Sequence, residues 1–208
     1  MTDPAVPTSI TDTAPPPGSP LPAVAPGRRR LGPAIETFDN WADVQLERFR
    51  GRSAADAVFV TATRLGDFSL VWHLVNVGRG LTSERRARQV PVLAASLGIE
   101  SLLVNQGLKR LFRRPRPTAE GDARFEIRRP LTSSFPSGHS SAAGFTATVL
   151  TGWDGGRLAV AWWGIGATVA LSRAYVRIHH ASDVVAGMAT GAVLGLVARR
   201  VLRRAGIR

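Results

Sequence analysis

The stretch "FPSGHSSAAGFTATVLTGW", residues 135–153, decides how the rest of this sequence is interpreted. It places a proline, two small residues and a histidine directly ahead of an apolar run. The run is rich in alanine, glycine, serine and threonine, which let helices in a membrane approach one another closely. His139 therefore stands at the mouth of a predicted membrane helix, where an ionisable side chain needs an explanation.

Four further stretches are similarly apolar, and arginine, glycine or proline bounds each of them: 55–77, 90–108, 158–171 and 184–198. A bilayer core requires about 20 apolar residues per helix. Residues 55–77 and 90–108 reach that length, and the others must tilt or borrow flanking residues. The sequence therefore predicts an all-α integral membrane bundle of about five transmembrane helices, with a soluble helical bundle as the alternative.

The chain before the first span divides into a tail and one more helix. Residues 1–33 are rich in proline and small residues, which predicts a disordered tail without the features of a signal peptide. Apolar residues recur at near-helical spacing over 34–50 and predict an interfacial helix, although packing on a soluble core would give the same pattern. We expect a membrane-embedded domain over 34–204 and a short basic end over 205–208.

Composition narrows the classes of partner. The 208 residues suffice for one domain, and the absence of cysteine excludes disulfides and thiolate metal ligands. The net charge of +12 suits either nucleic acid or anionic lipids and phosphate esters. The arginines cluster in the predicted connections and tails instead of along one helix, so we expect no nucleic-acid partner. The oligomeric state stays open.

Several polar residues fall inside the predicted spans. Arg64 and Asp67 are three residues apart and could neutralise each other, and Glu100, Asn105 and Gln106 occupy the second span. We interpret them as structural residues and as weak candidates for a catalytic site.

Three connections carry the residues suited to chemistry: 109–117, 135–140 and 172–183. If successive helices alternate in direction, all three connections lie at the same membrane face. Fixed cations and free N–H groups at a helix start bind phosphate oxygens, and a carboxylate beside a histidine makes it a better nucleophile. The pattern therefore predicts a phosphoryl-transfer site that uses no metal ion.

These residues resemble the three-part signature of the type 2 phosphatidic acid phosphatases, whose superfamily also contains the vanadium haloperoxidases. The resemblance covers about residues 55–200, in the order and spacing of that family. The matching residues are Lys109 with Arg116 and Pro117; Pro136, Ser137, Gly138 and His139; and Ser172, Arg173, His179 and Asp183.

The resemblance implies a lipid phosphatase without metal or cofactor. His179 would form a phosphohistidine, Asp183 would orient it, and His139 would protonate the leaving group and then activate water. The residues implied to hold the phosphate are Lys109, Arg116, Ser137, Gly138 and Arg173.

Other charged residues near the motifs have less specific interpretations. His180 competes with His179 for the nucleophile role, and the family spacing selects His179. We interpret five arginines as solvated or lipid-facing charges: Arg110, Arg113, Arg114, Arg128 and Arg129. They hint at a diphosphate headgroup, although a solvated charge run is the preferred explanation.

Alternatives remain for the activity and the sidedness. A vanadium haloperoxidase, a lipid phosphotransferase or a non-catalytic lipid-binding protein would carry similar residues. The substrate could be phosphatidate, phosphatidylglycerol phosphate or a polyprenyl phosphate. A raw count of arginines places the site in the cytoplasm, whereas the resemblance favours a multi-pass protein of the cell membrane with an extracytoplasmic site.

Overall fold

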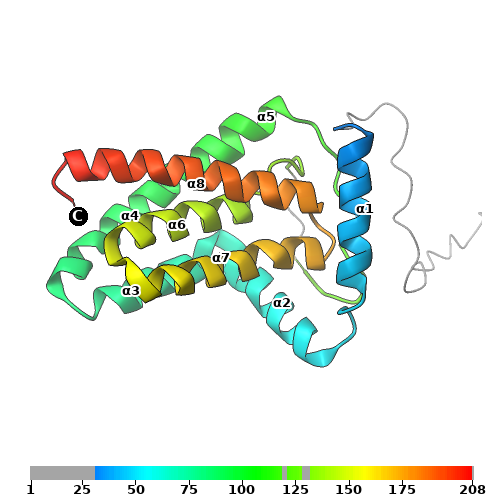
Figure 1. Cartoon of the computed structure of the whole chain (residues 1–208), viewed down its shortest axis with the longest axis horizontal. Helices are drawn as coiled ribbons and strands as arrows, with labels where there is room; N and C mark the ends of the chain where they lie inside the picture. The colour runs from blue at the N-terminus through cyan, green and yellow to red at the C-terminus, as the bar shows by residue number, and fades with distance from the viewer. Residues whose placement is uncertain (1–30, 119–120, 128–131, 208) are drawn as a thin grey trace, which may run out of the picture.

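The computed structural model describes residues 31–118, 121–127 and 132–207, and every regular element within these ranges is helical (Figure 1). Most of the predicted tail, with Arg128 and Arg129, lies outside the described residues. The elements are α1 (Pro33–Glu47), α2 (Ser53–Gly66), the 3₁₀ turn η1 (Asp67–Ser69), α3 (Leu70–Gly80), α4 (Glu84–Leu102), the π-helical segment η2 (Leu103–Leu108), α5 (Lys109–Leu111), α6 (Gly138–Asp154), α7 (Gly156–Tyr175) and α8 (Ala181–Arg204).

Helix α6 forms the centre of the bundle. Every residue from Ser140 to Leu150 is buried, and the helix packs against α4, α7 and α8. A helix that is apolar or small all round its circumference can be buried on every side, which is how the opening stretch behaves. The core that surrounds α6 includes Trp72 of α3 and Leu93 of α4.

The contact between α6 and α8 depends on glycine. A Cβ atom at Gly191 would collide with the backbone oxygen of Ser141, and one at Gly187 would collide with that of Ser137. A Cβ atom at Gly195 would lie 2.9 Å from the backbone oxygen of Phe145. The spacing of four residues places these glycines on one face of α8, so the two backbones come into direct contact.

Within the described ranges, two helical segments are long and apolar enough to cross a membrane: Glu84–Leu111, which joins α4 to α5, and Ala181–Arg204, which is α8. Their outer faces expose large apolar side chains, among them Ile99, Leu102, Val193 and Val197. Since soluble proteins rarely expose such continuous apolar surface, these faces suit contact with lipid. The all-helical prediction is confirmed, and the count of five transmembrane helices stays a prediction.

The prediction of one continuous span over 55–77 is wrong. The chain breaks at η1, where Phe68 and Ser69 adopt left-handed backbone angles with φ of 52° and 59°. Left-handed angles are costly for residues other than glycine and interrupt the helical hydrogen-bond ladder. The pattern of apolar residues indicates which residues are buried and carries no information about backbone angles. The break could therefore not be predicted from it. As a consequence, α2 and α3 meet at an angle beside the start of α6.

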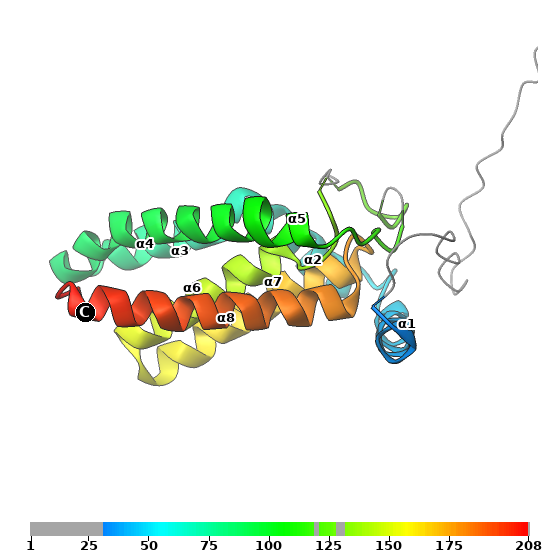
Figure 2. The same cartoon turned by 90° about the horizontal axis from the view of Figure 1, so that it is seen from above.

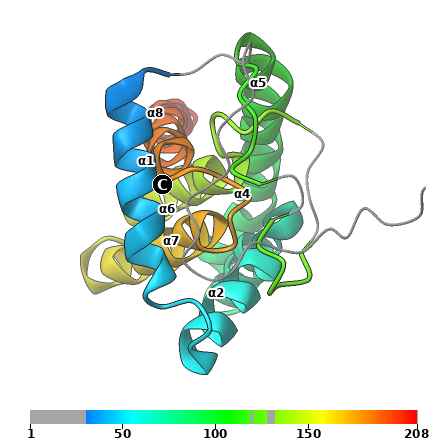
Figure 3. The same cartoon turned by 90° about the vertical axis from the view of Figure 1, so that its right-hand side faces the viewer.

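Helix α1 lies across one end of the bundle instead of running along it (Figures 1 and 3). It packs on α7 and α8, while Phe38, Trp41 and Val44 on its outer face are exposed. The end of the described chain lies at the opposite end of the bundle (Figure 2). The N-termini of α6 and α8 and the connection after α5 therefore share the end that α1 covers.

Candidate active site

The first motif enters the site from the end of α5. Lys109 is buried, and its Nζ donates a hydrogen bond to Thr132 Oγ1 at 3.3 Å. Arg116 follows in an extended segment, where Nη1 donates to the carbonyl of Ile178 at 2.7 Å and Nη2 to that of Thr132 at 3.1 Å. These backbone contacts hold the guanidinium beside the third motif.

The second motif forms the N-terminus of α6. Ser137 is the N-cap, and its Oγ accepts a hydrogen bond from the Ser140 Oγ at 2.9 Å. Gly138 approaches Asn105 so closely that a Cβ atom would lie 2.7 Å from its Oδ1, so a larger residue here would displace the Asn105 side chain. His139 comes next and lies 2.9 Å, Nε2 to Oδ1, from Asp67.

The third motif contributes the most deeply buried cation. Arg173 ends α7, and its Nη1 donates to the carbonyl oxygen of Thr63 at 3.2 Å. Its Nε and Nη2 atoms are buried and make no hydrogen bond to any residue in the described ranges. Two unsatisfied donors on a buried guanidinium are costly unless an anion binds them.

His179 and His180 both lie near Asp183, and their surroundings differ. His180 Nδ1 is 3.2 Å from Asp183 Oδ2, whereas His179 Nδ1 is 3.7 Å from the same oxygen. His179 Nε2, however, faces Arg116 Nη1 at 3.1 Å and His179 lines the main cavity. Distance to the carboxylate therefore does not favour His179, but access to the cavity and to a cation does.

Electrostatics keep the His179 ring neutral. Burial, together with the guanidinium of Arg116, lowers the pKa of His179 to about 3, although the Asp183 carboxylate acts in the opposite direction. At neutral pH one ring nitrogen therefore carries a lone pair. An Nδ1–H directed toward Asp183 and Ser134 would leave that lone pair on Nε2, the nitrogen that faces Arg116.

One cavity of about 580 Å³ joins the motifs. It is lined by Lys109 of the first motif, Gly138 and His139 of the second, and His179 of the third. Its volume falls in the range typical of small-molecule sites. The structure thus brings residues of all three connections to one cavity. Four other predicted site residues are not among its lining residues: Arg116, Ser137, Arg173 and Asp183.

Three residues near the motifs have contacts that the sequence analysis did not predict. Asp67 does not serve as a simple counter-ion of Arg64, because it lies beside His139 and 3.7 Å from Arg173 Nη1. Glu100 accepts a hydrogen bond from Ser141 and lines the cavity. Arg64 is exposed and reaches the carbonyl of Glu126.

The prediction that Arg114 is a solvated or lipid-facing charge is wrong. Arg114 is buried and forms ion pairs with Asp39 of α1 and Asp183 of α8. A run of arginines in a sequence does not show which member faces carboxylates from distant helices. The alternation of the run with Pro115 and Pro117 was the one local signal that the segment is ordered.

Buried cations, a helix N-terminus and a neutral histidine around one cavity suit a phosphate ester, so fold and site define an all-helical protein that handles such esters. Residues 90–207, more than half of the chain, match the family model of the PAP2 superfamily. The chain belongs to the PAP2 superfamily.

Two kinds of relative support this assignment. The chain is 28% identical, over 135 residues, to decaprenylphosphoryl-5-phosphoribose phosphatase of two Mycobacterium tuberculosis strains, and the alignment covers 65% of this chain and 73% of that protein. Its fold is similar to that of a transmembrane PAP2 type phosphatidylglycerolphosphate phosphatase from Bacillus subtilis, with a TM-score of 0.65, 20% identity, and coverage of 84% of this chain and 89% of that one. The family and its phosphatases make the chain a phosphoric ester hydrolase, and its two apolar helices indicate a membrane protein.

Proposed function

We propose that this chain hydrolyses a phosphate ester of a membrane lipid through a covalent phosphohistidine, without a metal ion. The observation that carries the proposal is the convergence of His179, His139 and Lys109 on one cavity. Arg116 lies 3.1 Å from His179 Nε2, and Arg173 lies 3.7 Å from Asp67, which also lines the cavity. The two unsatisfied nitrogens of Arg173 support a role as phosphate ligands.

In the first step, the Nε2 lone pair of His179 attacks phosphorus, a P–N bond forms, and the P–O bond to the lipid breaks. His139 gives a proton to the leaving alkoxide, so that the lipid departs as an alcohol. Asp183 stabilises the positive charge that develops on the His179 ring. Lys109, Arg116 and Arg173, with Ser137 and the N–H of Gly138, stabilise the negative charge on the phosphoryl oxygens.

In the second step, His139 takes a proton from water, and the hydroxide attacks the phosphohistidine. The P–N bond breaks, inorganic phosphate leaves, and His179 returns to its neutral form. The same imidazole therefore acts first as an acid and then as a base, which closes the proton balance of the cycle.

We further propose that the substrate is a phosphate monoester on a hydroxyl-bearing headgroup. Two carboxylates, Asp67 and Glu100, line the cavity together with Ser101 and Asn105. Carboxylates accept hydrogen bonds from hydroxyl groups and disfavour a second phosphate joined directly to the reacting one, as in a diphosphate. The substrate named for the Mycobacterium relative, which carries a phosphoribose, is of this kind.

Ion pairs between the loop arginines and carboxylates also favour a monoester over a diphosphate. Arg114 is bound to Asp39 and Asp183, and Arg124 is bound to Asp122 and Glu47. Arginines engaged in this way do not provide a second set of phosphate ligands. The arginine-rich loop therefore gives little support to a diphosphate substrate.

We place the protein in the cell membrane as a multi-pass bundle. The membrane-embedded domain covers residues 34–204, and its first helix, α1, lies at the membrane interface. The exposed apolar side chains of α4 and α8 would contact lipid tails. The cavity is lined by residues of η1, the end of α4 and the start of α6, so a headgroup can enter it while the lipid chain stays in the bilayer.

The test is phosphate release by the detergent-purified protein, in EDTA, from phosphatidylglycerol phosphate, phosphatidate and a polyprenyl diphosphate. We expect phosphate to be released fastest from phosphatidylglycerol phosphate. The chelator should not change the rate. His179→Gln should abolish both release and covalent labelling with ³²P. His180→Gln is the matched control, because it removes the neighbouring imidazole and leaves the cavity lining intact.

Each other result points to a defined alternative. Phosphate transfer to an added alcohol in place of release would identify a phosphotransferase, and bromide oxidation with added vanadate would identify a haloperoxidase. Lipid binding without turnover would leave a non-catalytic protein, and a strict requirement for magnesium would contradict the proposed charge stabilisation by arginine.

A further inference from the structure

Arg114 is buried between carboxylates of two different helices. Its Nη1 atom lies 2.5 Å from Asp183 Oδ1, and its Nη2 atom lies 2.5 Å from Asp39 Oδ2. Their side chains are 7%, 0% and 4% exposed for Arg114, Asp183 and Asp39, respectively. Asp39 belongs to α1, which lies outside the residues that match the family model, so the family assigns it no role.

Asp39 also holds the first turn of α8. Its Oδ1 accepts from the backbone N–H of Ser182 at 2.8 Å, and its Oδ2 accepts from the Ser182 hydroxyl at 2.9 Å. Arg114 Nη1 donates to the same hydroxyl at 2.7 Å. A carboxylate at the start of a helix satisfies free N–H groups there, and this one comes from another helix. The residue next to Asp183 is thereby fixed to α1.

The two oxygens of Asp183 have separate partners. Oδ1 is bound by Arg114, whereas Oδ2 accepts from the backbone N–H of His180 at 2.9 Å and from Ser134 Oγ. Oδ2 is also the oxygen nearest to His179 Nδ1. By occupying Oδ1, Arg114 fixes the rotation of the carboxylate and keeps Oδ2 turned toward the nucleophile.

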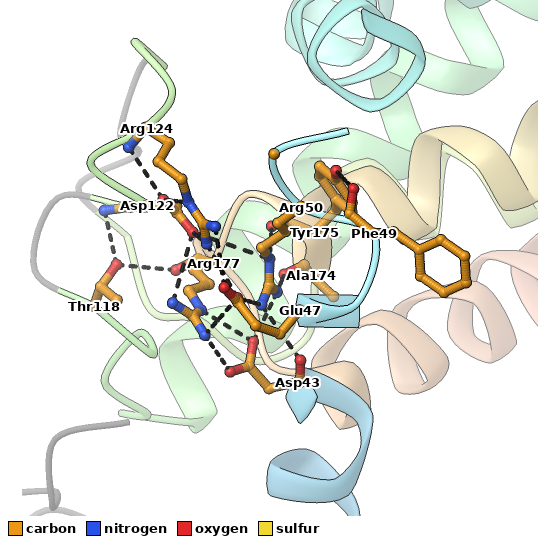
Figure 4. A network of polar contacts seen from close by, with 12 residues as sticks. Asp43, Glu47, Phe49, Arg50, Thr118, Asp122, Arg124, Ala174, Tyr175 and Arg177 are labelled. Atoms are coloured by element: carbon orange, nitrogen blue, oxygen red, sulfur yellow. Dashed lines mark hydrogen bonds and ion pairs between the residues drawn. The ribbon is translucent and has the colours of Figure 1, made fainter. Parts of the chain in front are cut away.

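A second network secures α1 in place (Figure 4). Asp43 of α1 accepts from Arg50 Nη2 at 2.7 Å and from Arg177 Nη2 at 2.8 Å. Glu47 accepts from Arg124 Nη1 at 3.0 Å. The acidic face of α1 is thus directed at the loops of the site, and the helix cannot shift without disturbing several ion pairs.

We propose that Asp39 and Arg114 form a positioning pair that sets the orientation of Asp183, so that α1 belongs to the catalytic machinery. The inference rests on the proposed phosphohistidine mechanism, in which Asp183 must stabilise the charge on His179. Without Arg114, Asp183 would lose the partner of Oδ1 and would be held through Oδ2 alone. Its orientation toward His179 would be less fixed, and His179 would form its phosphoryl bond more slowly. Substrate binding would change little, because neither residue of the pair lines the cavity.

The test compares Arg114→Gln, Arg114→Lys and Asp39→Asn in the full detergent-purified chain, with phosphatidylglycerol phosphate as substrate. We expect kcat and the rate of phosphoenzyme formation to fall about 10-fold to 100-fold, with KM within about 3-fold, because the lost interaction acts in the transition state. Arg114→Lys should recover only part of the rate, since an ammonium cannot make the two-pronged contact to both carboxylates.

Asp154→Asn is the matched control. It breaks an equally buried arginine–aspartate pair, with Arg79, at the opposite end of the bundle. This variant should lose thermal stability and keep its kcat. Asp39→Asn keeps the shape of the side chain, so it provides a folded variant even where Arg114→Gln does not fold.

The outcomes separate this inference from the proposed function. Wild-type kcat in folded Asp39→Asn, or losses that follow only the folded fraction as in Asp154→Asn, would overturn the positioning pair while the phosphatase stands. A wild-type protein that forms no phosphohistidine would overturn the proposed function itself, and the pair with it.

Discussion

The contact between Asp67 and His139 gives the proposed acid a partner of its own. The same Asp67 carboxylate lies 3.7 Å from Arg173 Nη1, so it contacts both the imidazole and a buried guanidinium. A carboxylate 2.9 Å from Nε2 favours a proton on that nitrogen and holds the ring in place. The break between α2 and α3 thus places the Asp67 carboxylate next to His139.

We therefore predict that Asp67→Asn slows hydrolysis most where the leaving group needs a proton. General acid–base catalysis contributes about 10²–10⁴-fold, so kcat on a lipid alkoxide should fall by up to about 100-fold. With p-nitrophenyl phosphate, whose leaving group departs unprotonated, the loss in the rate of phosphoenzyme formation should be small. Single-turnover rates of phosphoenzyme formation with both substrates measure the difference.

Asp56→Asn provides the comparison for that prediction. Asp56 is a carboxylate at the start of α2, and it accepts a hydrogen bond from the Tyr175 hydroxyl, away from the histidines. Its removal should affect both substrates alike. Equal losses on both substrates in Asp67→Asn would show that Asp67 acts only on the structure.

At the residue scale, the motif residues could be predicted from the sequence, and the residues that hold them in place could not. His179, His139 and the cations could be found because their spacing is local and specific. Asp39, Asp67 and Arg114 act across 69–75 residues of chain, as the contacts to Asp183 and His139 show. Local spacing carries no information about such pairs, and a charged side chain that faces the core through a distant partner resembles one that faces solvent.

At the scale of elements, the glycines of α8 make a prediction about packing. Gly191→Ala would place a methyl group against the Ser141 backbone, where only a movement of α6 could make room. We expect a loss of about 1–3 kcal/mol in stability, typical of an overpacked core. Because α6 begins at the second motif, activity should fall as well.

Gly164→Ala in α7 is the matched substitution. A Cβ atom at this position meets nothing within 4 Å, and alanine favours a helix over glycine by about 1 kcal/mol. Thermal unfolding of both variants in detergent should therefore give shifts of opposite sign. A Gly191→Ala protein as stable as the wild type would contradict the close contact of the two helices.

The start of α4 shows that a helix can extend beyond the apolar stretch that predicts it. The second span was predicted at 90–108, and α4 begins at Glu84, where Ser83 caps the helix and accepts from the N–H of Arg86 at 3.3 Å. The charged turn from 84 to 89 extends the helix beyond the apolar stretch, so the pattern located the apolar segment and missed the helix start. The serine was a local capping signal for that start.

At the scale of the whole molecule, charge differs between the two ends of the bundle. Four arginines near the site are engaged by carboxylates: Arg50, Arg114, Arg124 and Arg177. Four others at the same end are exposed: Arg48, Arg52, Arg110 and Arg113. The arginines of the opposite end are mainly exposed, and they include Arg85, Arg88, Arg157, Arg200, Arg203 and Arg204. Exposed arginines beside apolar helices bind anionic lipids of the cytoplasmic leaflet, whereas buried pairs serve the fold.

We accordingly predict that the site faces the extracytoplasmic side. The chain contains no cysteine, so one introduced thiol reports its own side of the membrane. Asn40→Cys lies on the exposed surface of α1 at the site end, and Glu84→Cys replaces a side chain that is 95% exposed at the opposite end. A membrane-impermeant maleimide should label Asn40→Cys in intact cells and Glu84→Cys only after lysis. The reverse pattern would place the site in the cytoplasm, and the arginines of the site end would then act as topology signals despite their ion pairs.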